Sequence, residues 1–257
     1  MIMVILEDTR QQEGKHKIKH RWFLDNGITW DRHKLIVGDY QLPGSSAVAV
    51  DTKFSIQELI GDIQVKAMSK KDTQKNVEDE IGLLDGFDDD TKAAFARDIF
   101  HLICDDDSDR NPESQIKGYC YLKGIPDKSS DRFLELYEKR HGFFHRGLVR
   151  AKQYGTQLYV LVDNTDGIKT VRDLFSWVNP RRLIMVKSKI IVGYYPSGNP
   201  KYKKVQKYPN CMSGGMLAKA CLTMQAKYGA RFVFCHPQES GQIIMDILTG
   251  NYEWQGE

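Results

Sequence analysis

Five consecutive apolar residues, Leu158 to Val162, come directly before Asp163. An uninterrupted apolar run of this length is typical of a strand buried on both faces of a sheet, which requires covering helices on both sides. Met3–Glu7 and Arg231–Cys235 also have the composition of buried strands, and segments with helical spacing alternate with them. The sequence therefore predicts an α/β fold with a mixed central sheet flanked by helices.

Local signals predict three further elements in the first quarter of the chain. Ile18, Trp22 and Phe23 have the spacing of one helix face, which we expect to be buried. Two extended segments on either side of a Pro-Gly-Ser-Ser turn predict a hairpin within residues 37–53. Ser55 is suited to cap the helix that follows this hairpin.

The length of 257 residues and the apolar fraction of 41% fit one large globular domain that carries an insertion. The five cysteines are widely spread and never form a Cys-x-x-Cys pair, so we expect reduced thiols rather than disulfides or a zinc site. The longest apolar run, Met1 to Leu6, is far shorter than the roughly 20 residues of a membrane span, and it lacks the basic flank of a signal peptide. We expect an intracellular protein, cytoplasmic or associated with the nucleoid, with no membrane partner.

Charge is strongly segregated along the chain, although the net charge is only +3. Thirteen acids lie within residues 72–109, whereas residues 181–207 contain eight Lys or Arg and no acid. We interpret residues 64–131 as an acidic, mostly helical insertion in a domain that spans 1–257. Residues 181–208 interleave lysines with tyrosines around a Pro-Ser-Gly-Asn-Pro turn, which predicts a basic hairpin that contacts nucleic acid.

Asp39, Asp51 and Lys53 form the most informative constellation. Asp51 and Lys53 are two residues apart on a predicted strand, so both side chains point to the same face, and Asp39 precedes the partner strand. Carboxylate oxygens are ligands that Mg²⁺ and Mn²⁺ prefer, and a neighbouring lysine can hold an attacking water during phosphodiester hydrolysis. This spacing also arises often by chance, and a charged strand edge without activity is the alternative interpretation.

The same residues lie in motifs that resemble the nuclease domain of the XPF and Hef structure-specific endonucleases. The resembling motifs are Ile5–Arg10, His33–Tyr40, Val50–Lys53 and Glu58–Leu59. The likeness covers residues 3–63 and resumes at Phe144–Ala151, Leu158–Asp163 and Ser213–Leu248. The resemblance implies a restriction-endonuclease-like fold of the PD-(D/E)xK superfamily. It also implies a Mg²⁺- or Mn²⁺-dependent DNA endonuclease that acts on branched or junction DNA.

The resemblance implies roles for individual residues as well. Asp39 and Asp51 are expected to be catalytic metal ligands, Asp8 a further ligand, and Lys53 the residue that positions the nucleophilic water. Glu58 is expected to serve as a catalytic base or to help hold a second metal ion. The residues expected to contact DNA are Arg10, Arg146, Arg150, Lys201, Lys203, Lys204 and Lys207. The two C-terminal helices form a dimer interface in the family, which implies a homodimer. An apolar stripe suits either that interface or the chain's own core, and it comprises Met216, Leu217, Ala220, Cys221 and Met224.

Departures from the family pattern keep other interpretations open. Asp51-Thr52-Lys53 stands where the family has Glu-Arg-Lys, Gln11 replaces an acid, and Gly147 replaces an acid or amide. Glu58 also lies one residue later than the family's acid. Gln11 and the missing arginine favour a non-catalytic DNA-binding or scaffolding subunit with a degenerate nuclease fold, whereas the retained Asp39, Asp51 and Lys53 favour an enzyme. An RNA nuclease of the tRNA-splicing type is disfavoured by the metal-binding carboxylates.

Overall fold

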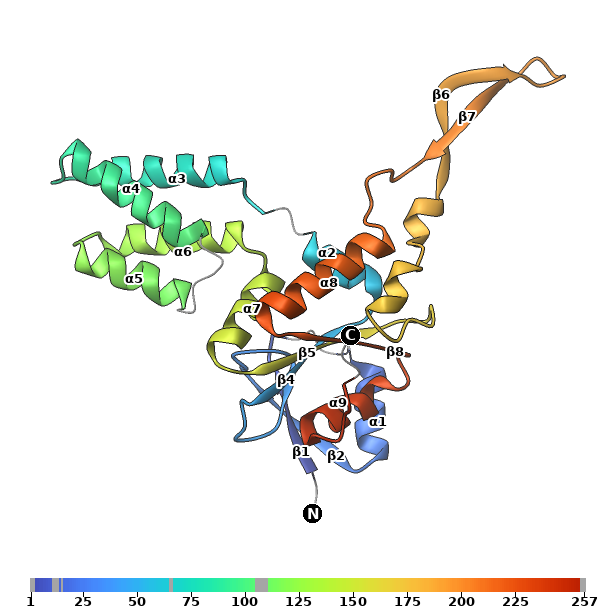
Figure 1. Cartoon of the computed structure of the whole chain (residues 1–257), viewed down its shortest axis with the longest axis horizontal. Helices are drawn as coiled ribbons and strands as arrows, with labels where there is room; N and C mark the ends of the chain where they lie inside the picture. Colours follow the sequence, from blue (N-terminus) through green and yellow to red (C-terminus); the bar gives the residue numbers. More distant parts are fainter. Residues whose placement is uncertain (1–2, 11–13, 15, 65–66, 105–110, 255–257) are drawn as a thin grey trace.

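A six-stranded sheet forms the centre of the protein in the computed structural model, which describes residues 3–10, 14, 16–64, 67–104 and 111–254 (Figure 1). Its strand order is β2-β1-β3-β4-β5-β8. Neighbouring strands are parallel except on either side of β3, which is antiparallel to both β1 and β4. The strands are β1 (Met3–Asp8), β2 (Ile28–His33), β3 (Tyr40–Gln41), β4 (Val48–Lys53), β5 (Gln157–Asp163) and β8 (Arg231–Cys235).

Helices cover both faces of this sheet, as the doubly buried strand β5 requires. One face packs against α1 (Lys17–Asp25) and α9 (Ser240–Thr249), and the other against α2 (Ile56–Ile63), α7 (Phe143–Gln153) and α8 (Gly214–Tyr228). The predicted α/β class, with a mixed central sheet between helices, is confirmed. Across the described segments, no helix is both long enough and apolar enough to cross a membrane.

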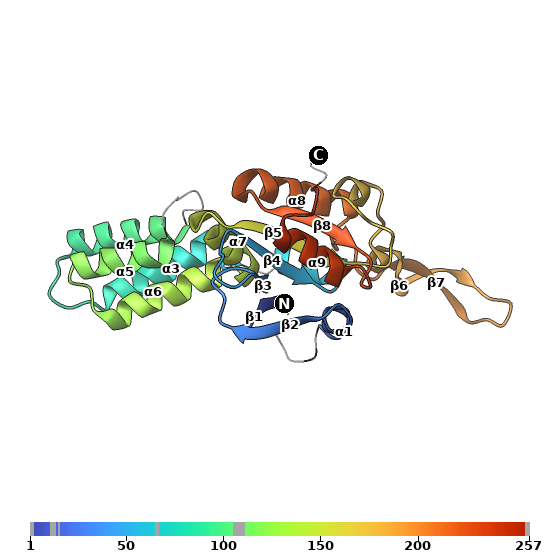
Figure 2. The same ribbon diagram turned by 90° about the horizontal axis from the view of Figure 1, so that it is seen from below.

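Four helices between α2 and α7 form a unit with its own apolar core (Figures 1 and 2). They are α3 (Lys70–Gly82), α4 (Asp89–Cys104), α5 (Pro112–Leu122) and α6 (Asp127–Arg140). The expected end of the insertion at residue 131 falls inside α6. Phe133 and Tyr137 of this helix are buried in that same core, so the unit includes the rest of α6. The two ends of the unit are tied together, since the backbone N–H of Met68 donates to the carbonyl of Lys139 at 3.0 Å.

The basic segment forms a two-stranded arm of β6 (Met185–Tyr194) and β7 (Pro200–Gln206), which follows two short 3₁₀ helices, Arg172–Phe175 and Pro180–Leu183. In both views the arm projects from the body at the end opposite the helical unit (Figures 1 and 2). The side chains of both strands are mostly exposed. A two-stranded hairpin without a packed face is marginally stable in water.

The apolar stripe of α8 packs mainly into the chain's own core. Leu217 and Cys221 have no exposed surface, and Met224 packs against the same cluster. Met216, by contrast, is 55% exposed. Most of the stripe is therefore used within one chain, and the homodimer through the C-terminal helices stays a prediction.

Gly38 allows the hairpin of β3 and β4 to close. Its φ is +72°, and a Cβ atom there would lie 3.0 Å from the carbonyl oxygen of Val50 and 3.1 Å from the Cβ of Ala49. Gly44 has a similar φ of +73°, but an added Cβ would meet nothing within 4 Å. Both positions favour glycine for the left-handed backbone, whereas only Gly38 also needs it for close contact.

We expect Gly38→Ala to lower the free energy of unfolding by more than Gly44→Ala does. The left-handed backbone costs about 1–2 kcal/mol in each variant, and the crowding at position 38 adds roughly 1–3 kcal/mol. Urea unfolding of the two variants beside the unsubstituted protein measures both effects. Equal losses would show that β4 moves aside without cost.

Candidate active site

The chain direction of β3 brings the predicted carboxylates together. Because β3 is antiparallel to β1 and β4, the segment that leads into it lies at the same edge as the ends of those two strands. Asp39 is fixed there by its backbone, since its N–H donates to the carbonyl of Val50 at 2.7 Å and its carbonyl accepts from the N–H of Asp8 at 2.9 Å. Asp8 ends β1 and Asp51 lies near the end of β4.

These residues line one small pocket of about 100 Å³, which has room for roughly three waters. The polar or charged lining comprises Asp8, Arg10, Asp39, Asp51, Lys53 and Arg150, and the remainder includes Gly38, Phe143, Phe144 and Gly147. A larger cavity of about 590 Å³ lies beside β8. It contains none of the predicted carboxylates, so we place the candidate site at the smaller pocket.

Asp39 is a buried carboxyl group held by two hydrogen bonds. Its Oδ2 accepts from the backbone N–H and from the hydroxyl of Thr52, both at 2.7 Å. Burial, followed by the neighbouring charge of Asp51, raises the pKa of Asp39 to about 7, although the Thr52 donors oppose the shift. Near neutral pH, a cation that approaches this site therefore stabilises the ionised form of Asp39.

Lys53 lies between two carboxylates. Its Nζ is 2.9 Å from Oδ2 of Asp51 and 2.9 Å from Oδ2 of Asp62. Burial alone would lower the pKa of Lys53, but the charges of Asp51 and Asp62 outweigh it and hold this pKa well above its ordinary value. Burial raises the pKa of Asp51, which the charge of Lys53 opposes. Lys53 is therefore protonated throughout the physiological pH range.

Asp62 contacts Lys53 of the candidate site although the sequence motifs did not reveal it, and neither Asp62 nor Glu58 lines the pocket itself. One oxygen of Glu58 accepts from the N–H of Phe54 at 2.7 Å, and its own N–H donates to the Ser55 hydroxyl at 3.1 Å, so Glu58 helps cap α2. Asp62 lies one helical turn further on and contacts Lys53 directly. The spacing of four residues from Glu58 is a signal that could have suggested Asp62, because such residues share a helix face.

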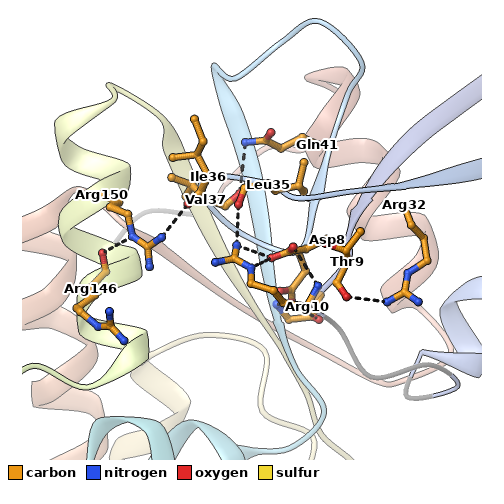
Figure 3. Close-up of polar contacts among 12 residues, drawn as sticks. Asp8, Thr9, Arg10, Arg32, Leu35, Ile36, Val37, Gln41, Arg146 and Arg150 are labelled. Carbon is orange, nitrogen blue, oxygen red and sulfur yellow. Dashed lines mark hydrogen bonds and ion pairs between the residues drawn. The ribbon is translucent and has the colours of Figure 1, made fainter. Parts of the chain in front are cut away.

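Asp8 is engaged by Arg10 (Figure 3). The Nε of Arg10 donates to Oδ2 of Asp8 at 2.7 Å, and the backbone N–H of Arg10 donates to Oδ1 at 3.2 Å. The same guanidinium donates to the carbonyl of Leu35 at 2.6 Å. The carboxylate expected as a further metal ligand is thus paired with the arginine expected to contact DNA.

Two other predicted arginines, Arg146 and Arg150, come from α7 (Figure 3). Arg150 lines the pocket and donates to the carbonyl of Ile36 at 3.5 Å and to that of Arg146 at 3.3 Å. Arg146 is paired with Glu138 of the helical unit. The predicted lysines, by contrast, lie on or next to β7 of the arm, away from the pocket (Figure 1). They are Lys201, Lys203, Lys204 and Lys207.

A divalent cation at this site would have only a few ligands from the protein. Within the described parts of the chain, no group of three or more His, Cys, Asp or Glu side chains is placed to bind a metal ion. Asp39 and Asp51 nevertheless offer hard oxygen donors in one pocket, where burial disfavours their negative charge. Mg²⁺ is commonly held by one or two carboxylates and keeps several waters, so these two residues fit such an ion.

Comparison with known proteins gives only a weak structural likeness. No family model matches the chain, and no curated protein matches it in sequence. The solved structure of XPF from Aeropyrum pernix is matched over 97% of this chain and 66% of that chain, with 12% identity and a TM-score of 0.33. This chain thus spans just under two thirds of the length of that protein, and at this TM-score the likeness supports no conclusion about function.

We expect the apo protein to lose stability as the pH rises from about 4 to about 7, in part because of Asp39. Its pKa is higher in the folded protein, about 7, than the ordinary value of 3.8. Its contribution is therefore fully present below about pH 4, falls progressively as the pH rises and is lost above about pH 7, by a few kcal/mol at most. Urea unfolding in EDTA at several pH values should show a flatter profile for Asp39→Asn.

The exposed Asp90→Asn on α4 is the matched control for that measurement, and its profile should follow the unsubstituted protein. Parallel profiles for Asp39→Asn and the unsubstituted protein would contradict the raised pKa.

Proposed function

We propose that this protein is a Mg²⁺- or Mn²⁺-dependent endonuclease that hydrolyses phosphodiester bonds in DNA. The observation that carries the proposal is the meeting of Asp39, Asp51 and Lys53 in one pocket. Two of these residues are carboxylates for a hard cation, and the third is a cation fixed beside them. Arginines at the rim of the same pocket supply the positive charge that a phosphate backbone requires.

The roles of the residues follow from their charge states. Asp39 and Asp51 would hold the metal ion, which supplies Lewis-acid activation of the phosphate and lowers the pKa of a bound water. Lys53 stays protonated between Asp51 and Asp62. It is therefore unsuited to be the general base, and it positions the attacking water and compensates negative charge at the phosphate. Arg10 and Arg150 bind the phosphates next to the one that is cut.

A non-catalytic DNA-binding subunit is the second candidate, and the pairing of Asp8 with Arg10 favours it. In that pair Arg10 binds the carboxylate of Asp8, which was expected to complete the metal site. Incubation with labelled flap, fork, Holliday-junction and linear DNAs, in Mg²⁺, Mn²⁺ or EDTA, separates the two candidates. Metal-dependent cleavage supports the enzyme. Tight binding without cleavage in either metal ion supports the subunit and contradicts the nuclease.

We expect Asp39→Asn and Asp51→Asn to abolish cleavage but to keep or strengthen DNA binding in EDTA, because each removes a negative charge that faces phosphate. Lys53→Ala should keep binding and lower the cleavage rate by about 10²–10³-fold, as is typical for the loss of one charge-stabilising group. Exposed Lys128→Ala on α6 is the control and should cut at the normal rate. Cleavage by Asp51→Asn at the normal rate would exclude the proposed centre.

We expect the arm to bind phosphates far from the pocket. Replacing Lys201, Lys203, Lys204 and Lys207 by Ala should reduce the slope of log affinity against log salt by about 0.9 for each phosphate of duplex DNA that the arm no longer neutralises. Fluorescence anisotropy at several salt concentrations measures this slope. The control replaces four exposed lysines of the helical unit, Lys70, Lys71, Lys75 and Lys128. If both quadruple variants keep the original slope, the arm does not touch DNA.

A further inference from the structure

Phe143 lies at the mouth of the pocket and turns away from the core. It is the first residue of α7 and is 59% exposed, whereas the next residue, Phe144, is 6% exposed. The ring of Phe144 lies beneath Lys53, with the ammonium group 4.7 Å from the ring centroid. A single exposed aromatic side chain is common on protein surfaces, so what distinguishes Phe143 is its surroundings.

Three guanidinium groups surround the ring of Phe143. Their central carbon atoms lie 5.7 Å (Arg10), 5.9 Å (Arg146) and 6.0 Å (Arg150) from the ring centroid. Burial lowers the pKa of Arg150, and the charges of Arg10 and Arg146 lower it further against the opposing effect of Glu113. Arg10 is already paired with Asp8, and Arg146 with Glu138. The charges of both arginines still act on Arg150, however, and an anion that binds between the three groups relieves this repulsion.

Two of these arginines are held in place by the loop between β2 and β3 (Figure 3). Arg10 donates to the carbonyl of Leu35, and Arg150 donates to the carbonyl of the next residue, Ile36. Their guanidinium groups are therefore positioned before any ligand arrives. Pre-positioned groups bind a ligand more tightly, because little conformational entropy is lost on binding.

The chemistry of the ring restricts the ligand. Phosphates satisfy the guanidinium groups, but a phenyl ring gains nothing from a phosphate. A nucleobase offers the flat face that stacks on aromatic and guanidinium groups alike. In a duplex the faces of each base are covered by the neighbouring bases, so a ring at a protein surface reaches a base face only when that nucleotide is unpaired.

We propose that Phe143, with Arg10, Arg146 and Arg150 around it, binds an unpaired nucleotide next to the phosphate that enters the pocket. The base stacks on the phenyl ring, and the flanking phosphates pair with the guanidinium groups. This inference rests on the proposed nuclease function and adds the part of the substrate that these four residues select. It gives a binding role to an exposed phenylalanine that the sequence motifs did not single out.

The test uses forked DNA that carries the fluorescent base 2-aminopurine, either in the unpaired arm beside the junction or within the duplex. In EDTA, which prevents cleavage, the full-length protein should quench the unpaired probe and leave the paired one unchanged. Phe143→Tyr should quench likewise. Phe143→Ala should lose the quenching and bind the fork about 5- to 100-fold more weakly, the typical effect of removing one stacked base, with unchanged affinity for duplex.

Phe175→Ala is the matched control, because Phe175 is 50% exposed and lies outside the pocket. Its quenching and affinities should equal those of the unsubstituted protein, and thermal unfolding of each variant shows whether it is folded. Unchanged quenching by Phe143→Ala overturns the inference, and so does an equal loss of affinity for fork and duplex.

The outcomes also separate this inference from the proposed function. A protein that cleaves DNA in Mg²⁺ or Mn²⁺ but quenches independently of Phe143 contradicts the nucleotide site alone. A protein that quenches through Phe143 but never cleaves contradicts the nuclease alone. A protein that binds none of the DNAs contradicts both.

Discussion

Burial of acidic side chains at one edge of the central sheet is the constraint on which the rest of the structure depends. A buried carboxylate is costly unless a cation or hydrogen-bond donors compensate it. Almost every buried or half-buried acid at this edge has a basic partner from another part of the chain or from its own turn. The pairs are Glu7 with His20, Asp8 with Arg10, Asp51 with Lys53, and Asp163 with Lys19. These pairs fix α1 on one face of the sheet and the pocket on the other.

Asp39 is compensated differently, because its Oδ2 accepts two hydrogen bonds from neutral donors of Thr52, while the charge of Lys53 also acts to lower its pKa. The hydrogen bonds fix the side chain in place but only partly offset its burial, so its pKa remains near neutrality. The negative charge of Asp39 thus remains costly in the folded protein, as does that of its neighbour Asp51, and a divalent cation would be useful beside both. In this protein the proposed activity and part of the electrostatic cost of the fold arise from the same two carboxyl groups.

Local patterns predicted the sheet, the hairpin and the meeting of Asp39, Asp51 and Lys53, because each depends on strand periodicity and on a short turn. They failed where the deciding partner is distant in sequence. Helical spacing predicted that Ile18 is buried, yet Ile18 is 44% exposed and its neighbour Lys19 is buried instead. The reason is an ion pair at 2.6 Å with a carboxylate 144 residues away. The loop carbonyls that hold the arginines were missed for the same reason, since no local spacing encodes them.

The tie between Met68 and Lys139 has a consequence for the order in which the chain folds. Strands β4 and β5 pair in parallel although about 100 residues separate them, and closing so long a loop is entropically unfavourable and slow. The helical unit has its own core of contacts that are local by comparison. If it forms first, its joined ends leave only two short links between β4 and β5. The insertion then shortens the search for the central strand pair instead of delaying it.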